Sequence, residues 1–264
     1  MRKHELRILT KEVTELARTV GYSIKQEIER LEEKDVREKR SNDFVTYVDK
    51  AAEETIVQKL QALFPEAGFI TEEGTASEKK KYTWVIDPLD GTTNFIHGIP
   101  SYSISIALRR RDTTIMGVIY EPNADECFFS WEGQPAFLNE KEIHVTNSDK
   151  LSDSLIATGF PYEKDETIDN YLNLLKDILK KSHGIRRIGS AAIDLAYVAC
   201  GRFEAFYEIG LHSWDVAAGA FIVQQAGGKV SDFSGGNKYI FDRQILASNS
   251  HIHDEMLRSI KNSM

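Results

Sequence analysis

The chain has 264 residues, of which 41% are hydrophobic and 28% charged, a length and composition that allow a folded protein with a sizeable core. It contains no apolar run of about 18 residues and no basic segment followed by an apolar one at its start, so we expect a cytoplasmic protein without a membrane span. The formal net charge of -8 opposes a nucleic-acid partner, because a general nucleic-acid surface needs a basic face.

Two amphipathic helices are predicted at the start of the chain. In both, apolar residues recur every three or four positions, the period of one helix face. The first series consists of Leu6, Leu9, Val13, Leu16, Val20, Ile24, Ile28 and Leu31. Ser41-Asn42-Asp43 interrupts it, and the second helix follows Asp49 and stops at Pro65.

Residues 68–131 favour strands. Short segments rich in β-branched and aromatic residues are typical of a sheet. They cover residues 68–71, 82–86, 103–108, 114–120 and 127–131.

After residue 150 strands and helices alternate. Strands are predicted at 155–160, 203–209 and near 229 and 245, with helices at 166–182, 191–199 and 214–226. This order indicates sheets covered by helices in layers. His251 and His253 lie two positions apart, would point in different directions from a helix, and are expected at the surface.

Two carboxylates follow a buried strand in the segment WVIDPLDGTTNFIHGIP, residues 84–100. At about 4 Å, Asp87 and Asp90 would repel each other by roughly 4 kcal/mol at an effective dielectric constant near 20. A divalent cation removes this repulsion, and Mg²⁺ prefers oxygen ligands, including a backbone carbonyl such as that of Leu89. The alternative is that both aspartates only cap the turn and helix that follow.

Other polar residues at the ends of elements favour the metal interpretation. Glu72 and Glu73 close the strand at 68–71, and Asp215 opens a helix, so three or four carboxylates could converge. A buried cluster of that kind is hard to explain without a metal ion. Gly91-Thr92-Thr93 adds backbone amides and hydroxyl donors suited to a phosphate ester. No HExxH, Walker A, GxSxG or strand-following GxGxxG motif competes with this site.

The motifs DPLDGTTNF and HSWDVAAGAFIVQQAGG resemble the paired signatures of the inositol monophosphatase family. Residues 41–54, 69–74, 189–201 and 206–215 resemble further blocks of the family in the same order. The resemblance implies an αβαβα layered fold over residues 1–264 as a single unit. Residues 1–150 would form a metal- and phosphate-binding half, and residues 151–264 an α/β half that completes the site. It also implies a homodimeric, Mg²⁺-dependent, lithium-sensitive phosphatase.

The resemblance also assigns roles to residues. Glu72, Asp87 and the Leu89 carbonyl would hold one metal, and Asp87, Asp90 and Asp215 a second, with roughly two or three ions per site. Both Mg²⁺ and Mn²⁺ accept such oxygen ligands. Glu72, Thr92 and Asp49 would be catalytic, and Lys39 would lie on a loop near the metals. The substrate-binding residues would be Asp90, Gly91, Thr92, Gly189, Ser190, Ala191, Glu208 and Asp215.

The predicted function is hydrolysis of a small phosphate monoester by a metal-activated water, with inositol 1-phosphate ranked first. Fructose bisphosphate or another sugar phosphate, histidinol phosphate, phosphoadenosine phosphate and NADP are the alternative substrates. A non-enzymatic alternative is a regulatory protein on this fold that contacts RNA or the transcription machinery through its basic runs at 79–81 and 109–111.

Overall fold

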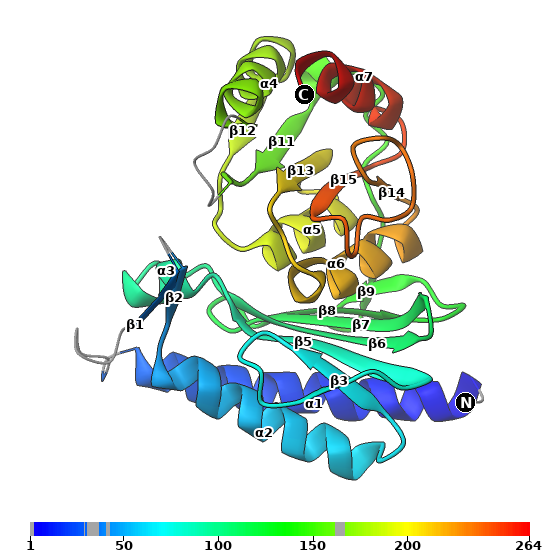
Figure 1. Cartoon of the computed structure of the whole chain (residues 1–264). Helices are drawn as coiled ribbons and strands as arrows, with labels where there is room; N and C mark the ends of the chain where they lie inside the picture. The colour runs from blue at the N-terminus through cyan, green and yellow to red at the C-terminus, as the bar shows by residue number, and fades with distance from the viewer. Residues whose placement is uncertain (1–2, 29, 31–36, 41–42, 162–166) are drawn as a thin grey trace.

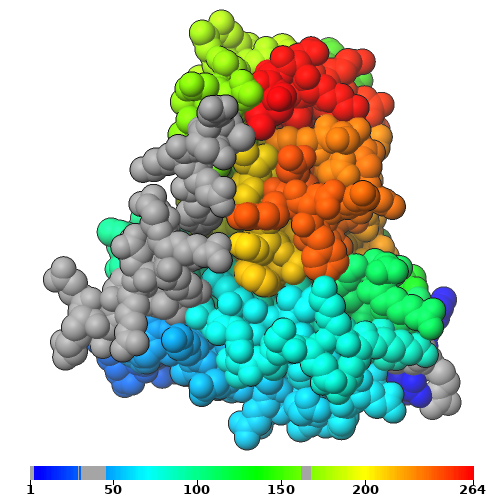
Figure 2. Space-filling view, viewed as in Figure 1, coloured from blue at the N-terminus to red at the C-terminus, as the bar shows by residue number. Residues whose placement is uncertain are grey.

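A computed structural model describes residues 3–28, 30, 37–40, 43–161 and 167–264, with residues 37–40, 43–45 and 167 described by their backbone alone. The described elements form five layers, helices, sheet, helices, sheet, helices, which confirms the predicted αβαβα fold (Figure 1). In space-filling view the segments of the second half, from yellow to red, pack on top of the cyan and green segments of the first (Figure 2).

The first two layers come from the first half of the chain. Helices α1 (Lys3–Glu27) and α2 (Tyr47–Leu63) cover one face of an eight-stranded sheet. In spatial order this sheet contains β10 (Lys141–Ile143), β9 (Ala136–Leu138), β8 (Glu126–Trp131), β7 (Thr113–Glu121), β6 (Ser103–Arg110), β5 (Tyr82–Asp90), β3 (Gly68–Thr71) and β4 (Ser77–Glu78). Neighbouring strands are antiparallel except for the parallel pair β3 and β5.

The remaining three layers come from the second half. Helices α5 (Ala191–Ala199) and α6 (Ser213–Gln225) lie between the two sheets. The second sheet has the order β12 (Gly184–Arg186), β11 (Leu155–Thr158), β13 (Ala205–Ile209), β15 (Gln244–Ser248) and β14 (Lys229–Ser231). Helices α4 (Thr167–Lys181) and α7 (His253–Ser263) cover its outer face.

Side-chain alternation along the strands explains why the large sheet is buried on both faces. On β5, Trp84 and Ile86 pack toward α1 and α2, whereas Val85 packs toward α5 and α6. On β6, Ile106 and Ala107 divide in the same way. Because helices cover both faces, these strands are apolar at nearly every position rather than at every second one.

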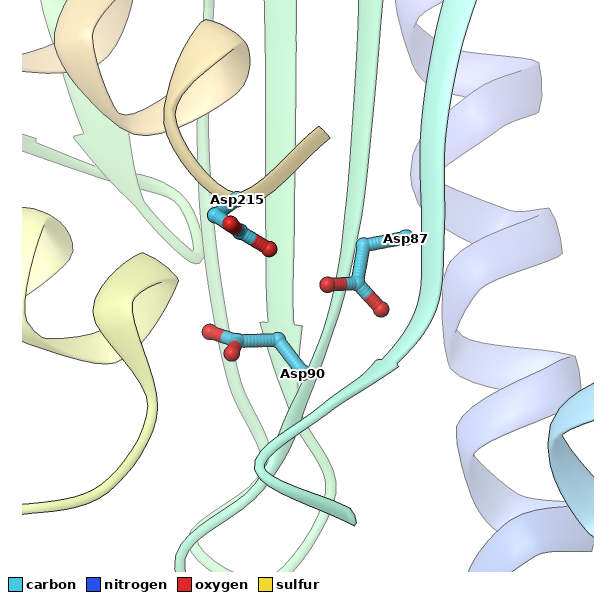
Figure 3. Close-up of side chains that lie close together, drawn as sticks. All are labelled: Asp87, Asp90 and Asp215. Atoms are coloured by element: carbon cyan, nitrogen blue, oxygen red, sulfur yellow. The ribbon is translucent and has the colours of Figure 1, made fainter. Parts of the chain in front are cut away.

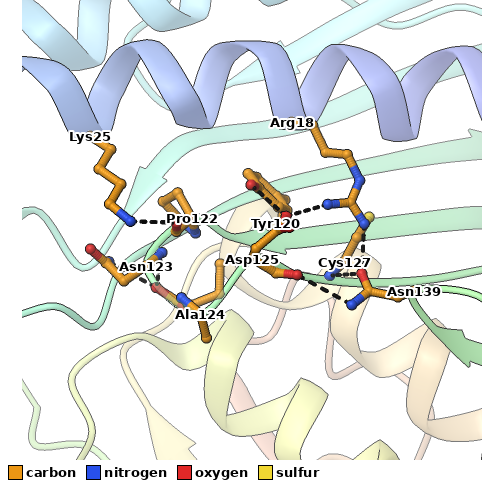
Figure 4. A network of polar contacts seen from close by, with 10 residues as sticks. Arg18, Lys25, Tyr120, Pro122, Asn123, Ala124, Asp125, Cys127 and Asn139 are labelled. Atoms are coloured by element: carbon orange, nitrogen blue, oxygen red, sulfur yellow. Dashed lines mark hydrogen bonds and ion pairs between the residues drawn. The ribbon is translucent and has the colours of Figure 1, made fainter.

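Helix α1 is also held by polar contacts to the turn between β7 and β8 and to the turn between β9 and β10 (Figure 4). Arg18 Nη2 donates to Asn139 Oδ1 at 2.6 Å, and its Nη1 pairs with the Asp125 carboxylate. Lys25 Nζ donates to the Pro122 carbonyl at 3.3 Å. These contacts fix the first layer on the sheet that carries the candidate site.

The predicted helices and strands are confirmed, with limits that differ in places. Helix α1 ends at Glu27, so Ile28 follows the helix, and Leu31 lies outside the described residues. Several short elements were not predicted: β1 (Arg37–Arg40), β2 (Asp43–Val45), β4, β9, β10, β12, the 3-10 turn η2 (Leu151–Asp153) and α7. The helix expected after the two aspartates is α3 (Thr92–Ile96). The expectation of a surface His253 is wrong, since this residue is fully buried as the first residue of α7, whereas His251 is exposed.

Among the helices in the described part of the chain, none combines the length and the apolarity needed to cross a membrane.

Candidate active site

Three aspartates converge where β5 ends and α6 begins. Asp87 and Asp90 lie on β5, and Asp215 lies in the first turn of α6 on the opposite side (Figure 3). Each of the three carboxylates offers an oxygen, and these oxygens lie within 4.8 Å of one another. Residues 151 to 264 therefore contribute one carboxylate to a cluster built mainly by the first half.

Local structure explains why the carboxylates meet. The pairing of β5 with β6 shifts register between Asp87 and Asp90, and such a bulge re-aims side chains at the end of a strand. Asp87 pairs with Ser105, whose hydroxyl donates to the Trp214 carbonyl at 3.0 Å. This bond joins β6 to the residue that precedes Asp215.

The charges of the cluster are mutually unfavourable. Burial raises the pKa of Asp87 well above its usual value, and the neighbouring carboxylates of Glu72, Asp90 and Asp215 raise it further. The pKa of Asp215 is likewise raised well above its usual value, first by burial and then by Asp90 and Glu72. Acidic oxygens that repel one another in a buried site are the donor set that a hard divalent cation such as Mg²⁺ prefers. The residues present therefore fit a metal centre.

Asp90 is held more strongly by hydrogen bonds than the other two. Burial raises its pKa, but its carboxylate accepts from Ser190 Oγ at 2.6 Å and from the Ala192 amide at 2.7 Å, and both bonds lower the pKa. The Ala191 amide also donates to it. Asp90 therefore links the aspartate cluster to the start of α5.

Thr92 lies next to the cluster in a hydrogen-bonded arrangement with α2. Its hydroxyl is 3.0 Å from Asp49 Oδ1 and 3.0 Å from the Leu89 carbonyl. Asp49 Oδ2 is occupied by the Thr46 hydroxyl at 2.6 Å and by the Thr46 amide at 2.8 Å. Two bonds from Thr46 thus fix the buried Asp49 beside Thr92, so the structure brings together two of the residues that the resemblance predicts to be catalytic.

Gly91 begins α3 with a φ of 98°, in the left-handed region that glycine adopts without strain. A Cβ at this position would also lie 3.1 Å from the Ser101 carbonyl and 3.2 Å from the Gly189 carbonyl. The turn at Gly91 therefore approaches the backbone before α5 too closely for another residue type.

The other predicted substrate residues lie at the start of α5 and on β13. Ser190 caps α5, and Gly189 and Ala191 flank it. Glu208 lies on β13 with its carboxylate over Gly159, where a Cβ would come within 2.1 Å of it. Burial raises the pKa of Glu208 well above its usual value, whereas the Arg187 guanidinium lowers it.

Lys39 lies on β1, and its side chain is outside the described part of the structure. The other predicted site residues are brought together.

Sequence reasoning missed four polar residues around the site. Asn94 donates to the Ser101 carbonyl at 2.7 Å and to the Ile188 carbonyl at 2.9 Å, which ties α3 to the segment before α5. Asp194 is buried on α5, and the charges of Glu208, Asp90 and Arg187 all act on its pKa, which burial raises well above its usual value. Arg187 is an exposed cation near these carboxylates, and Glu53 binds backbone amides beside Glu72. Asn94, Asp194 and Glu53 belong to segments that the sequence singled out, whereas Arg187 lies just before the block at 189–201.

The fold and the site define a class of metal-dependent phosphatase-like proteins, and comparison with known families supports this. The sequence profile described as the inositol monophosphatase family matches residues 5–264. The chain belongs to the inositol monophosphatase family.

Relatives within the family carry two kinds of name. The chain is 43% identical to a protein of Pseudomonas aeruginosa named Nus factor SuhB, over 93% of each chain. It is 38% identical to an inositol-1-monophosphatase of Mesorhizobium japonicum, over 94% of each chain. Among solved structures, extragenic suppressor protein suhB from Bartonella henselae superposes with a TM-score of 0.91 at 38% identity, covering 97% of this chain and 100% of that one.

Proposed function

We propose that the protein is a Mg²⁺-dependent phosphoric monoester hydrolase that acts on small phosphorylated polyols, inositol 1-phosphate first among them. The observation that carries this proposal is the convergence of the Asp87, Asp90 and Asp215 oxygens within 4.8 Å beside the Thr92 hydroxyl. Membership of the inositol monophosphatase family supports the reaction class.

The metal ligands we assign are those of the sequence prediction. Glu72, Asp87 and the Leu89 carbonyl would hold one Mg²⁺, and Asp87, Asp90 and Asp215 another; Mn²⁺ would fit the same oxygens. When bound, such ions neutralise phosphoryl oxygens and lower the pKa of a coordinated water.

Thr92 and Asp49 would orient the attacking water. Asp49 Oδ1 accepts the Thr92 hydroxyl proton, so a Thr92 Oγ1 lone pair is available to accept a hydrogen bond from water. Glu72, beside Asp87, would accept a hydrogen bond from the other hydrogen of this water and take up that proton as the water attacks. The amides at Gly91 and Thr92 start a helix and would donate to the phosphate oxygens, since the first amides of a helix have no partner within it.

The leaving alcohol would lie between Asp90 and Glu208, with Gly189, Ser190 and Ala191 forming the adjoining wall. Buried carboxylates accept hydrogen bonds from neighbouring hydroxyls, which favours a polyol over an apolar alcohol. The inositol-1-monophosphatase from Mesorhizobium japonicum supports inositol phosphate as the first choice. Sugar bisphosphates, histidinol phosphate, phosphoadenosine phosphate and NADP are the alternatives.

Phosphate release by the purified protein with Mg²⁺ tests the proposal. The panel contains inositol 1-phosphate, fructose 1,6-bisphosphate, histidinol phosphate, phosphoadenosine phosphate and NADP, each with and without Li⁺. We expect the highest kcat/KM on inositol 1-phosphate and inhibition by Li⁺. Turnover no greater than that of an Asp87→Asn variant on every substrate would refute the enzymatic assignment.

We further propose that the protein is a cytoplasmic homodimer. Sedimentation velocity of the purified chain measures its mass directly, and a monomer at micromolar concentration would contradict the dimer.

A second candidate function is a role in transcription, because relatives with 39% to 43% identity are named Nus factor SuhB. A surface feature favours it. The two basic runs lie side by side, with the Arg111 amide donating to the Lys81 carbonyl at 2.8 Å. Near them Phe241 is 53% exposed, with Lys79 and Arg109 at 5.3 and 4.8 Å from its ring centroid. Cations around an exposed aromatic ring suit single-stranded nucleic acid.

Binding of fluorescently labelled single-stranded RNA across a range of salt concentrations tests this candidate. The expected result is binding that weakens steeply with salt and weakens further in a Phe241→Ala variant. Electrostatic binding to nucleic acid is strongest at low salt, so no detectable binding under those conditions would remove this function.

A further inference from the structure

Helix α2 presents two buried carboxylates to the site, although only one of them was predicted. Asp49 and Glu53 are four residues apart, so they lie on the same helix face about one turn apart. Both side chains have 0% exposure. Asp49 holds Thr92 on the turn after β5, which raises the question of what Glu53 holds.

Glu53 binds the backbone that follows β3. Its Oε2 accepts from the Glu73 amide at 2.7 Å, and its Oε1 accepts from the Thr75 amide at 2.8 Å. Both oxygens of the carboxylate are therefore used within one turn of the chain, around Gly74 with its φ of 78°.

Glu72 lies immediately before this turn. Its amide bonds to the Ile86 carbonyl of β5 at 3.3 Å, and the Thr71 hydroxyl bonds to the Ala76 carbonyl at 3.2 Å. These contacts hold the base of the turn to the sheet, whereas Glu53 holds its outer part to α2. Without Glu53, the segment that carries Glu72 would lose its two short bonds to the helix layer.

We propose that Glu53 is a positioning residue that fixes the Glu72 carboxylate at the metal centre; this inference rests on the proposed function. Helix α2 then aligns two segments that are distant in sequence. Asp49 sets the position of Thr92, and Glu53 sets that of Glu72. Because both carboxylates lie on one helix, α2 also fixes the distance between Thr92 and Glu72, the two groups proposed to orient the attacking water.

Replacing Glu53 by glutamine keeps the shape of the side chain but turns one acceptor oxygen into an amide donor. One of the Glu73 and Thr75 amides would then face a donor and lose its bond. Loss of an outer contact to a metal ligand commonly weakens metal binding by about 10- to 100-fold. The matched control is Glu54→Gln, the same substitution at the neighbouring, exposed position of α2.

Isothermal titration calorimetry with MgCl₂, without substrate, is the main measurement. We expect Glu53→Gln to bind Mg²⁺ about tenfold more weakly than the wild type. Hydrogen exchange should be faster in peptides covering residues 71–78 and unchanged in peptides covering 103–121. Activity should recover toward the wild-type kcat at high Mg²⁺, and Glu54→Gln should match the wild type in every readout.

Wild-type Mg²⁺ affinity in a Glu53→Gln protein with a lower melting temperature would overturn the inference, because it would show a purely structural role. If Glu53→Gln does not fold, the same titration on Glu53→Asp, whose shorter side chain cannot reach both amides, decides in the same way. Mg²⁺ binding by a wild type that hydrolyses no phosphate ester would refute the proposed function but leave the positioning role intact. Absence of Mg²⁺ binding to the wild type would refute both.

Discussion

Asp87 shows the conflict between stability and function at the scale of a single residue. Its carboxylate is buried among those of Glu72, Asp90 and Asp215. Asparagine removes this charge and keeps an oxygen to accept from the Leu89 amide, which lies 2.9 Å from Asp87 Oδ1. We expect Asp87→Asn to be more stable than the wild type by about 1 kcal/mol in EDTA. Its Mg²⁺-dependent turnover should fall by about two orders of magnitude or more.

Thermal unfolding in EDTA and in MgCl₂ checks the stability part of this prediction. The wild type should gain stability from Mg²⁺, and Asp87→Asn should gain much less. Asp149→Asn, a substitution at an exposed aspartate, is the control and should behave as the wild type. A lower melting temperature for Asp87→Asn in EDTA would show that Asp87 has a structural role. This is the alternative interpretation, in which the aspartate only caps the turn that follows.

Gly159 offers a test of the substrate side that leaves the metal ligands in place. A Cβ at Gly159 would lie 2.1 Å from the Glu208 carboxylate, which is the far end of a side chain and not backbone, so Gly159→Ala should displace Glu208 rather than disrupt the fold. We expect KM for inositol 1-phosphate to rise about tenfold, the effect of one lost hydrogen bond to a charged group. Hydrolysis of p-nitrophenyl phosphate, which has no polyol hydroxyls, should change little. Equal losses on both substrates would argue against Glu208 as a contact to the alcohol.

Single residues also show how far the sequence predicts the site. Asp87 and Asp90 were identifiable because three positions and a strand end bring them together. Asp215 was a candidate because it opens a helix, but its place beside Asp90 rested on resemblance, since spacing alone does not bring together two residues 125 positions apart. Glu53 was missed because its partners are backbone amides, which carry no residue-type signal.

Whole elements were predictable where they carried many apolar residues. Helices α1 and α2 show the helical hydrophobic period. Strands β5 to β8 and helix α6 were recognised instead as continuous apolar segments, because they are buried on more than one face. The pairs β1 with β2 and β9 with β10 have three or four residues per strand, too few for alternation to be recognised. Helix α7 was missed because only a few of its residues, among them Met256 and Ile260, face the core.

Helix α7 also carries a group that makes stability depend on pH. His253 lies between Ser231 Oγ at 3.0 Å and Ser248 Oγ at 2.8 Å, and burial, assisted by Lys229, lowers its pKa to about 4. The unfolded chain, with a pKa near 6.5, binds the proton first. The contribution of neutral His253 is therefore complete above pH 6.5 and is lost as the pH falls toward 4.

A His253→Gln variant should be less stable than the wild type at pH 7, by about 1–3 kcal/mol. This difference should shrink as the pH falls from 6.5 to 4, because glutamine does not titrate. Urea unfolding at pH 7, 6 and 5 measures it, with His251→Gln at the exposed neighbouring histidine as the control. A difference that stays constant over this range would show that the pKa of His253 is the same in the folded and the unfolded chain.

At the scale of the whole molecule, α6 joins the two halves. One face of the helix packs so closely on β7 that a Cβ at Gly117 would lie 2.7 Å from the Ala218 carbonyl. On another face, a Cβ at Gly219 would lie 2.5 Å from Leu195 of α5. The same helix supplies Asp215 to the metal cluster. We therefore propose that residues 1–264 fold as one unit, and that residues 1–150 and 151–264 share a core rather than forming independent domains.

Gly117→Ala tests this proposal because the added methyl group meets backbone, which cannot rotate away. We expect a loss of about 2–3 kcal/mol, typical of an overpacked core. If the chain is one unit, hydrogen exchange should accelerate equally in peptides from β5 to β8 and in peptides from β11 to β15, within a single unfolding transition. Gly184→Ala is the matched control, since a Cβ there has its nearest contacts at an ordinary 3.6 Å, and it should cost far less. Faster exchange in only one half of Gly117→Ala would instead show two domains that unfold separately, with the metal cluster at their interface.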